Sequence, residues 1–297
     1  MYTSILKTII VMLLVASCAS TKKETTIHQD LNTTAVCTAE TVEPVRINAS
    51  DSVDGMVSKG SGIWLDTPYG DNIFITNAHL IKNTIMNSNG TVKSRKIYKK
   101  IYVIDSQGMK VQVKVIAHRQ LMQTKNNLEN YSFTVHKMAD IAILVAVDEI
   151  PVNFKASKHR LAIKSKNTNA YLGGFSSLSK DDLTKYKSKN TRVQHCTYSL
   201  HDKTAIYLHE NMHGAYNGSS GTAIIDDDGY IQGLVTVGNN SQEGERNHVH
   251  QNKDGSIYIS FANKASNIPQ LKLYAIGTNH HEIRKLLHET FKNNNND

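Results

Sequence analysis

The sequence predicts an all-β fold of the sandwich or barrel type with one helix at its C-terminal end. Short apolar runs rich in β-branched residues recur from about residue 56 to residue 261, and Gly, Asn, Asp or Ser bounds most of them. A second observation is the turn sequence Asp226-Asp-Asp-Gly229, which is typical of a β-hairpin. The third is a helical spacing of apolar residues between His281 and Phe291, which predicts the helix.

The strand prediction follows these runs in chain order. They are Gly62–Leu65, Ile73–Ile75, Ile101–Ile104, Val111–Ile116, Ile141–Val145, Ala205–Leu208, Ala223–Ile225, Ile231–Val237 and Ile257–Phe261. Most are alternating or continuously apolar, as expected of half-buried or fully buried strands. In the C-terminal segment, Ile283, Leu286, Leu287 and Phe291 fall near one helix face.

Length and composition limit how many folded domains the chain can form. Its 297 residues suffice for one large domain or two small ones, and 39% of them are hydrophobic, which is enough for a packed core. The formal net charge is +8, with a basic cluster between Lys93 and Lys110. We interpret the cluster as a solvated face, and attraction to anionic lipid or acidic substrates is the alternative. No nucleic-acid motif accompanies the charge, so no nucleic-acid partner is expected.

The N-terminal segment predicts export. Lys7 supplies positive charge, Ile9–Val15 form a short apolar stretch, and small residues lead to Cys18. The stretch is too short for a spanning helix and is typical of a signal peptide. The sequence V-A-S-C ending at Cys18 resembles the lipobox of bacterial lipoproteins. That resemblance implies cleavage before Cys18, a lipid on Cys18, and attachment to the bacterial cell envelope in the periplasm or at the surface. The alternative is a plain secretory peptide cut one or two residues further on.

Composition also divides the chain into segments. We expect a signal peptide over 1–17, a polar tether over 18–48, a folded domain over 49–276, and a helix with a disordered tail over 277–297. With Cys18 lipidated, Cys37 and Cys196 remain. Export permits a disulfide between these two cysteines, and two free thiols are the alternative.

Three short blocks carry residues suited to nucleophilic catalysis. They are Gly60-Ser-Gly with Thr76-Asn-Ala-His79, Ala139-Asp140-Ile-Ala, and Gly218-Ser-Ser220-Gly. A serine hydroxyl is a weak nucleophile that an adjacent histidine activates, and a carboxylate orients that histidine. Each block by itself could be a strand end, a buried strand or a flexible loop. Together they favour His79 as general base, Asp140 as its partner and Ser220 as nucleophile.

In these blocks the chain resembles the trypsin-like serine peptidases, and the resemblance covers about residues 56–265. Histidine, aspartate and serine follow one another in the family's order. The resemblance implies two packed antiparallel six-stranded β-barrels, over about 49–155 and 156–276, with the active site between them. It also implies a serine endopeptidase that cleaves a protein or peptide substrate through an acyl-enzyme, without cofactor or metal. We expect a monomer.

The same resemblance implies further site residues. Backbone N–H groups of Gly218 and Ser220 would form the oxyanion hole. Thr236, Val237 and Gly238 would form the strand edge that pairs with substrate backbone, and Gly214 would lie at the base of the primary pocket. Because no acidic residue stands there, a strong preference for Arg or Lys is not expected, and a medium apolar side chain is predicted.

Departures from the family pattern keep one alternative open. The family commonly has Asp or Asn at Ser219, Gly at Thr222 and Pro at Ala223. The change at Ser219 bears on whether the oxyanion loop is formed in the resting state. A catalytically inactive trypsin-fold binding lipoprotein is therefore the first alternative function.

Two other motifs point to different chemistry. His209-Glu210-Asn-Met-His213 matches the H-E-x-x-H zinc-peptidase motif, in which two histidines one helical turn apart bind the metal. That motif requires a helix, whereas the residues before it are typical of a strand and glycines follow it. The sequence around Ser220 also approaches the α/β-hydrolase elbow, but Thr222 replaces the required glycine and the triad order is reversed. A zinc peptidase is thus the weaker alternative.

Overall fold

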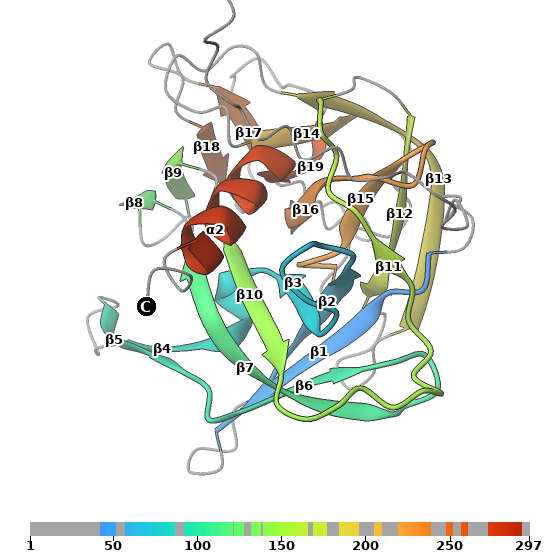
Figure 1. Cartoon of the computed structure of the whole chain (residues 1–297). Coiled ribbons are helices and arrows are strands. Elements are labelled where there is room, and N and C mark those ends of the chain that lie inside the picture. Colours follow the sequence, from blue (N-terminus) through green and yellow to red (C-terminus); the bar gives the residue numbers. More distant parts are fainter. Residues whose placement is uncertain are drawn as a thin grey trace, which may run out of the picture. The chain divides into compact units, whose positions relative to one another are not determined.

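The structure of the chain is a computed structural model (Figure 1). The described residues are 42–51, 57–86, 92–120, 122–127, 132–137, 139–165, 169–176, 184–195, 205–209, 219–238, 248–251, 257–260 and 273–292. The chain divides into two units, residues 1–35 and 36–297, and every described residue belongs to the second. The predictions for Cys18, Cys37, Cys196, Gly214 and Gly218 lie outside the described residues.

The N-terminal half forms a closed ring of antiparallel strands. They are β1 (Val45–Ser50), β2 (Val57–Leu65), β3 (Ile73–Thr76), β6 (Lys100–Ile104), β7 (Lys110–Arg119) and β10 (Ile141–Ala146). Their order is β1-β6-β7-β10-β3-β2, and pairing of β1 with β2 closes the ring. The short strand β11 (Lys158–His159) adds to β2 in parallel. We call this ring barrel one.

The C-terminal half forms a second closed barrel, barrel two, from six strands. They are β12 (Asn169–Ser176), β13 (Thr184–His195), β14 (Ala205–His209), β15 (Ala223–Asp226), β16 (Ile231–Gly238) and β19 (Leu273–Asn279), in the order β12-β13-β14-β19-β16-β15. The predicted hairpin joins β15 to β16, and its Gly229 has a φ of +83°, which glycine tolerates without strain. The structure confirms the prediction of a mostly β fold with a C-terminal helix.

Further strands lie outside the two barrels. β4 (Lys82–Met86) pairs with β5 (Val92–Ile97) as a hairpin. A four-stranded sheet joins β8 (Met122–Asn127) and β9 (Ser132–Lys137) to β17 (His248–Gln251) and β18 (Ile257–Ser260), through the pairing of β9 with β18. In the chain, β8 and β9 precede β10 of barrel one, whereas β17 and β18 precede β19 of barrel two. The two halves of the chain therefore share this sheet.

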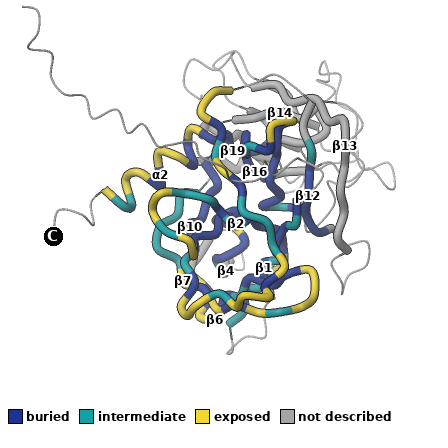
Figure 2. Tube along the Cα trace, turned by 45° about the vertical axis from the view of Figure 1, so that its right-hand side comes forward, coloured by how far each residue is buried: buried dark blue, intermediate teal, exposed yellow. Residues whose placement is uncertain are grey.

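Two apolar cores explain the continuous apolar runs at β3 and β10. Alternate side chains of a strand point to opposite faces. Phe74 and Leu144 pack in the interior of barrel one, whereas their neighbours Ile73, Ile75 and Ile143 pack in a second core that also contains residues of barrel two and the helix. Figure 2 shows β10 buried along most of its length, and all four residues of β3 are buried as well. Because both faces of β3 and β10 are buried, neither strand can alternate with polar residues.

The C-terminal helix α2 (His280–Lys292) closes the second core. Asn279 caps it, because its side-chain oxygen accepts hydrogen bonds from the backbone N–H groups of His281 and Glu282 at 3.0 and 3.3 Å. The expected apolar face is confirmed: Ile283, Leu286 and Leu287 are buried, and Phe291 packs against the same cluster. Among the described residues, no helix is long and apolar enough to span a membrane.

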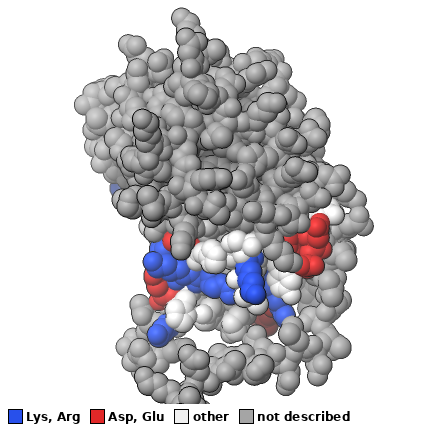
Figure 3. All heavy atoms as spheres, turned by 90° about the horizontal axis from the view of Figure 1, so that it is seen from above, with Lys and Arg blue, Asp and Glu red and all other residues white. Residues whose placement is uncertain are grey.

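Charged residues of the basic cluster are exposed where their side chains are described. Lys96, Lys99, Lys100 and Lys110 are all exposed, as expected of a solvated face. On the face drawn in Figure 3, Lys and Arg lie beside Asp and Glu in the described part of the surface. The net positive charge is thus interrupted by acidic side chains on that face.

The connection between the barrels is fixed by a buried histidine. His159 is only 2% exposed, and its Nδ1 lies 3.0 Å from the Gly229 carbonyl oxygen while its Nε2 lies 2.8 Å from Ser157 Oγ. The Asp66 N–H in turn donates to the His159 carbonyl at 2.9 Å. Burial lowers the pKa of His159 below its ordinary value of 6.5, although the hydrogen bond to Gly229 partly opposes this.

We predict that this histidine makes folding sensitive to acid. Below about pH 6.5 the unfolded chain takes up a proton that the folded chain resists, so stability falls as pH drops toward the lowered pKa. His159→Asn should therefore show a smaller fall in melting temperature between about pH 7 and about pH 5 than the wild type. The control is His288→Asn, on the exposed side of α2, which should keep the wild-type pH slope. Equal slopes for all three proteins would contradict this explanation.

Candidate active site

The histidine and aspartate of the first two blocks meet at one end of barrel one. β3 and β10 are antiparallel neighbours with Thr76 opposite Ala142. The residues just after β3 and just before β10 therefore lie at the same end of the strand pair. His79 follows β3 in the 3-10 helix η2 (Ala78–Ile81), and Asp140 directly precedes β10.

Asp140 binds His79 through both carboxylate oxygens. Its Oδ2 lies 2.5 Å from His79 Nδ1, and its Oδ1 accepts the His79 backbone N–H at 3.0 Å. The Asp140 side chain is 2% exposed, whereas that of His79 is 43% exposed. With Nδ1 facing the carboxylate, Nε2 is the nitrogen that remains to exchange a proton with another group.

This pairing also sets the charge of the imidazole. Burial by itself would lower the pKa of His79, but the negative charge of Asp140 and its hydrogen bond outweigh that effect. The pKa of His79 therefore lies above its ordinary value of 6.5. A histidine that is bonded to a carboxylate at one ring nitrogen and has the other available suits a group that takes up and releases a proton during a reaction.

Ser220 lies in a tight turn that β2 and β16 hold from both sides. The Ser61 N–H donates to the Ser220 carbonyl, and the Gly221 N–H donates to the Val235 carbonyl, both at 2.8 Å. The Thr222 N–H closes the turn on the Ser219 carbonyl at 2.9 Å. The loop thus takes its shape from strands of both barrels.

The hydroxyl of Ser220 is not bonded to His79. Ser220 Oγ donates to the Thr236 carbonyl oxygen in a long contact of 3.5 Å. No hydrogen bond links Ser220 with His79 among the residues that the structure describes. The structure thus brings His79 and Asp140 into direct contact, and it joins Ser220 to the backbone of β16.

The remaining predicted site residues are only partly described. Thr236 is buried at 4% exposure, and Val237 and Gly238 continue β16 and pair with Ile276 and Ala275 of β19. His209 ends strand β14. Glu210 and His213 lie outside the described residues. Because the zinc motif requires its first histidine on a helix, the strand at His209 argues against a zinc peptidase.

Gly60 and Ser61 have a supporting role that the sequence did not assign. A Cβ added to Gly60 would stand 2.3 Å from Leu80 Cδ1 and 3.0 Å from the Ser220 carbonyl oxygen. Ser61 Oγ accepts the Phe175 N–H at 2.8 Å, while the Ser61 carbonyl accepts Thr76 Oγ1 at 2.6 Å. Glycine within a strand often marks such a close backbone approach, so the G-S-G pattern was the available signal.

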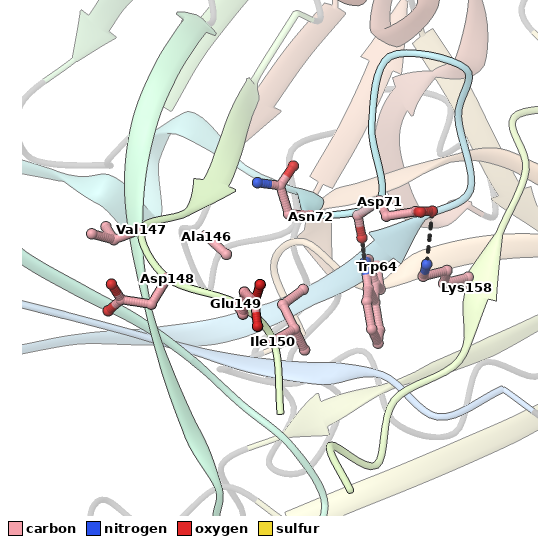
Figure 4. Close-up of a pocket in the computed structure, with 9 residues that line it drawn as sticks. All are labelled: Trp64, Asp71, Asn72, Ala146, Val147, Asp148, Glu149, Ile150 and Lys158. Atoms are coloured by element: carbon pink, nitrogen blue, oxygen red, sulfur yellow. Dashed lines mark hydrogen bonds and ion pairs between the residues drawn. The ribbon is translucent and has the colours of Figure 1, made fainter. Parts of the chain in front are cut away.

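One described pocket lies away from these residues. It has a volume of about 570 Å³ and is lined by Trp64, Asp71, Asn72, Ala146, Val147, Asp148, Glu149, Ile150 and Lys158. Lys158 Nζ lies 4.6 Å above the Trp64 ring and bonds Asp71 Oδ1 at 3.0 Å (Figure 4). Asn72 and Ala146 stand at the ends of β3 and β10 that are remote from His79 and Asp140. At ~3.3 Å per residue, the strand from Asp140 to Ala146 is roughly 20 Å long. The pocket is not part of the candidate site.

A family comparison identifies the class of protein. A family model described as Trypsin matches residues 67–257, which is more than half of the chain. The chain therefore belongs to the trypsin family of serine peptidases. No group of three or more His, Cys, Asp or Glu side chains able to hold a metal ion occurs among the described residues. No match was found among curated proteins.

Three solved structures similar to this chain include one described as a serine endoprotease and one described as a protease. The serine endoprotease from Yersinia pestis is 12% identical, with a TM-score of 0.46, over 88% of this chain and 68% of its own. An inactive mutant form of Rv3671c from M. tuberculosis is 12% identical, with a TM-score of 0.40, over 83% and 86%. The active form of the Rv3671c protease is 13% identical, with a TM-score of 0.38, over 74% and 76%. All TM-scores lie below 0.5, so the family assignment depends on the sequence match.

We predict that Gly221 is essential for the Ser220 turn. Gly221 and Gly108 have φ values of +83° and +89°, where an L-residue costs roughly 1–2 kcal/mol. A Cβ at Gly221 would also stand 2.1 Å from the Ser61 carbonyl oxygen, whereas one at Gly108 would meet nothing within 4 Å. Gly221→Ala should therefore lower the free energy of unfolding clearly more than the control Gly108→Ala. Equal losses in urea denaturation would contradict a backbone clash at Gly221.

Proposed function

We propose that this chain is a serine endopeptidase with His79, Asp140 and Ser220 as its catalytic triad. One observation carries the proposal. In this chain of the trypsin family, the buried Asp140 binds both the ring Nδ1 and the backbone N–H of His79. The turn bearing Ser220 is fixed between strands of both barrels, as a nucleophile held in one geometry requires.

In the proposed reaction, Ser220 Oγ leaves the Thr236 carbonyl and turns toward His79 Nε2. His79 removes the hydroxyl proton while Oγ attacks the substrate carbonyl carbon, and Asp140 stabilises the imidazolium that forms. Collapse of the tetrahedral intermediate breaks the peptide bond, and His79 Nε2 gives the proton to the leaving amine. Water activated by the same histidine then attacks the acyl-enzyme, which releases the carboxylic acid and restores Ser220.

The oxyanion and the substrate backbone need their own partners. We propose the backbone N–H groups of Gly218 and Ser220 for the oxyanion, where each donor is worth about 3–4 kcal/mol. The edge formed by Thr236, Val237 and Gly238 would pair with the substrate as an added strand. We propose a preference for a medium apolar side chain, since Gly214, at the base of the proposed pocket, carries no acidic group that would bind Arg or Lys.

One observation favours a second function. Ser220 Oγ contacts the Thr236 carbonyl at 3.5 Å and makes no described bond to His79. If this arrangement persisted on substrate binding, the chain would be an inactive trypsin-fold lipoprotein that binds peptides without cleaving them. Whether Ser220 reacts with a probe for activated serines distinguishes the peptidase from the binding protein.

Labelling with a fluorophosphonate probe tests the proposed activity. The wild type should form an adduct at Ser220, found by peptide mass spectrometry, because only an activated serine reacts. His79→Ala should react at least about 10³-fold more slowly. Ser219→Ala is the matched control and should keep labelling, since Ser219 is buried at 2% exposure. A wild type that folds but does not label would favour the binding lipoprotein.

We also propose that the enzyme is held at the bacterial cell envelope by a lipid on Cys18. The support is the sequence V-A-S-C at the end of a short apolar stretch. Cells fed an alkyne-tagged fatty acid should transfer the tag to the wild type and to Cys37→Ser, but not to Cys18→Ser. Secretion of an untagged wild-type protein would instead indicate a plain signal peptide.

A further inference from the structure

A buried amide lies between the candidate aspartate and barrel two. Asn77 is 0% exposed and directly precedes η2, which carries His79. Its Nδ2 donates to the Asp140 carbonyl oxygen at 2.8 Å and reaches Thr236 Oγ1 at 3.4 Å. One side chain thus contacts the aspartate residue of barrel one and strand β16 of barrel two.

Barrel two also holds the other side of the aspartate. The Asp140 backbone N–H donates to Thr278 Oγ1 on β19 at 3.1 Å, and Thr278 Oγ1 lies 3.5 Å from Thr236 Oγ1. Thr278 is 0% exposed. Both backbone polar groups of Asp140 are therefore bonded, while both carboxylate oxygens face His79. The aspartate has little freedom to turn away from the imidazole.

The same contacts extend to the serine. The carbonyl of Thr236 accepts Ser220 Oγ, and the hydroxyl of Thr236 accepts Asn77 Nδ2. Residue Thr236 thus connects Ser220, through its carbonyl, with Asn77, through its hydroxyl, and Asn77 in turn reaches Asp140. These contacts cross from barrel two to barrel one without passing through His79.

The amide has a cost that apolar packing would avoid. Asn77 Oδ1 is buried and has no hydrogen-bond partner among the described residues. An unsatisfied buried acceptor destabilises the folded state. Groups that break such local rules are expected at functional sites, where another gain offsets the loss. At Asn77 the gain is the donor that reaches Asp140 and Thr236.

We propose that Asn77 is a positioning residue that aligns Asp140 with Ser220 across the boundary between the barrels. The inference rests on the proposed function and names a residue of that same site. Asn77 acts through Asp140 and Thr236 and does not touch the substrate. Alanine lacks the donor, and aspartate would replace it with an acceptor beside the Asp140 carbonyl.

The test compares Asn77→Ala with the wild type by fluorophosphonate labelling, peptide hydrolysis and titration of His79 by NMR. Asn77→Ala should lower the labelling rate and kcat by about tenfold or more, well short of the ~10⁴-fold loss on replacing a triad carboxylate. KM should stay unchanged, and the pKa of His79 should fall because Asp140 is less well aligned. Ser157→Ala, which removes a hydroxyl bonded to Glu43 N–H at 2.8 Å in the connection between the barrels, should keep the wild-type rate.

A second pair of variants covers the case that Asn77→Ala does not fold. Thr236→Val removes the hydroxyl that accepts Asn77 Nδ2, with little change in shape, and should slow labelling, whereas Thr236→Ser keeps the hydroxyl and should restore it. Given a wild type that labels, the inference would be overturned if Asn77→Ala labelled at the wild-type rate with an unchanged His79 pKa, or if Thr236→Val and Thr236→Ser labelled at equal rates. A wild type that does not label at all would instead reject the proposed function.

Discussion

The hydrogen bonds of Asp140 are the interaction on which the candidate site depends. His79 binds the carboxylate from barrel one, and Thr278 binds the backbone N–H from barrel two. A buried carboxylate that lost these partners would be costly to desolvate, so the fold and the site constrain each other. The aspartate is thus both the electrostatic partner of the imidazole and a point of attachment between the barrels.

The apolar cores keep this arrangement rigid. β3 and β10 are buried on both faces, so the strand ends that carry His79 and Asp140 cannot shift without opening one core or the other. The helix α2 closes the shared core, and Arg119 of β7 forms ion pairs with Glu282 and Glu289 of the helix. Residues far apart in the chain therefore support one small group of polar side chains.

Much of the fold could be predicted from local sequence because β-branched runs and turn residues act over short distances. The hairpin at Asp226–Gly229 and the apolar face of α2 are examples. The pairing of β9 with β18 could not be predicted, because strand pairing across more than a hundred residues leaves no local pattern.

The candidate site, like the fold, could be predicted from the sequence only in part. His79, Asp140 and Ser220 stood in motifs that the sequence displays, and the first two lie in contact. The supporting roles of Ser61, Asn77 and Thr278 depend on which hydroxyl or amide meets which backbone group after folding. Such pairings follow from register and strand order, so the residue type by itself could not reveal them.

The proposed function requires the side chains of His79, Asp140 and Ser220 to act as one catalytic unit. A crystal structure of the protein after reaction with a phosphonate inhibitor would show whether they do. We expect a phosphorus–Oγ bond at Ser220, with Oγ displaced from the Thr236 carbonyl. His79 Nε2 should lie within hydrogen-bonding distance of the adduct while Nδ1 stays on Asp140. An unmodified Ser220 still bonded to Thr236, or an adduct with His79 turned away, would contradict the proposed function.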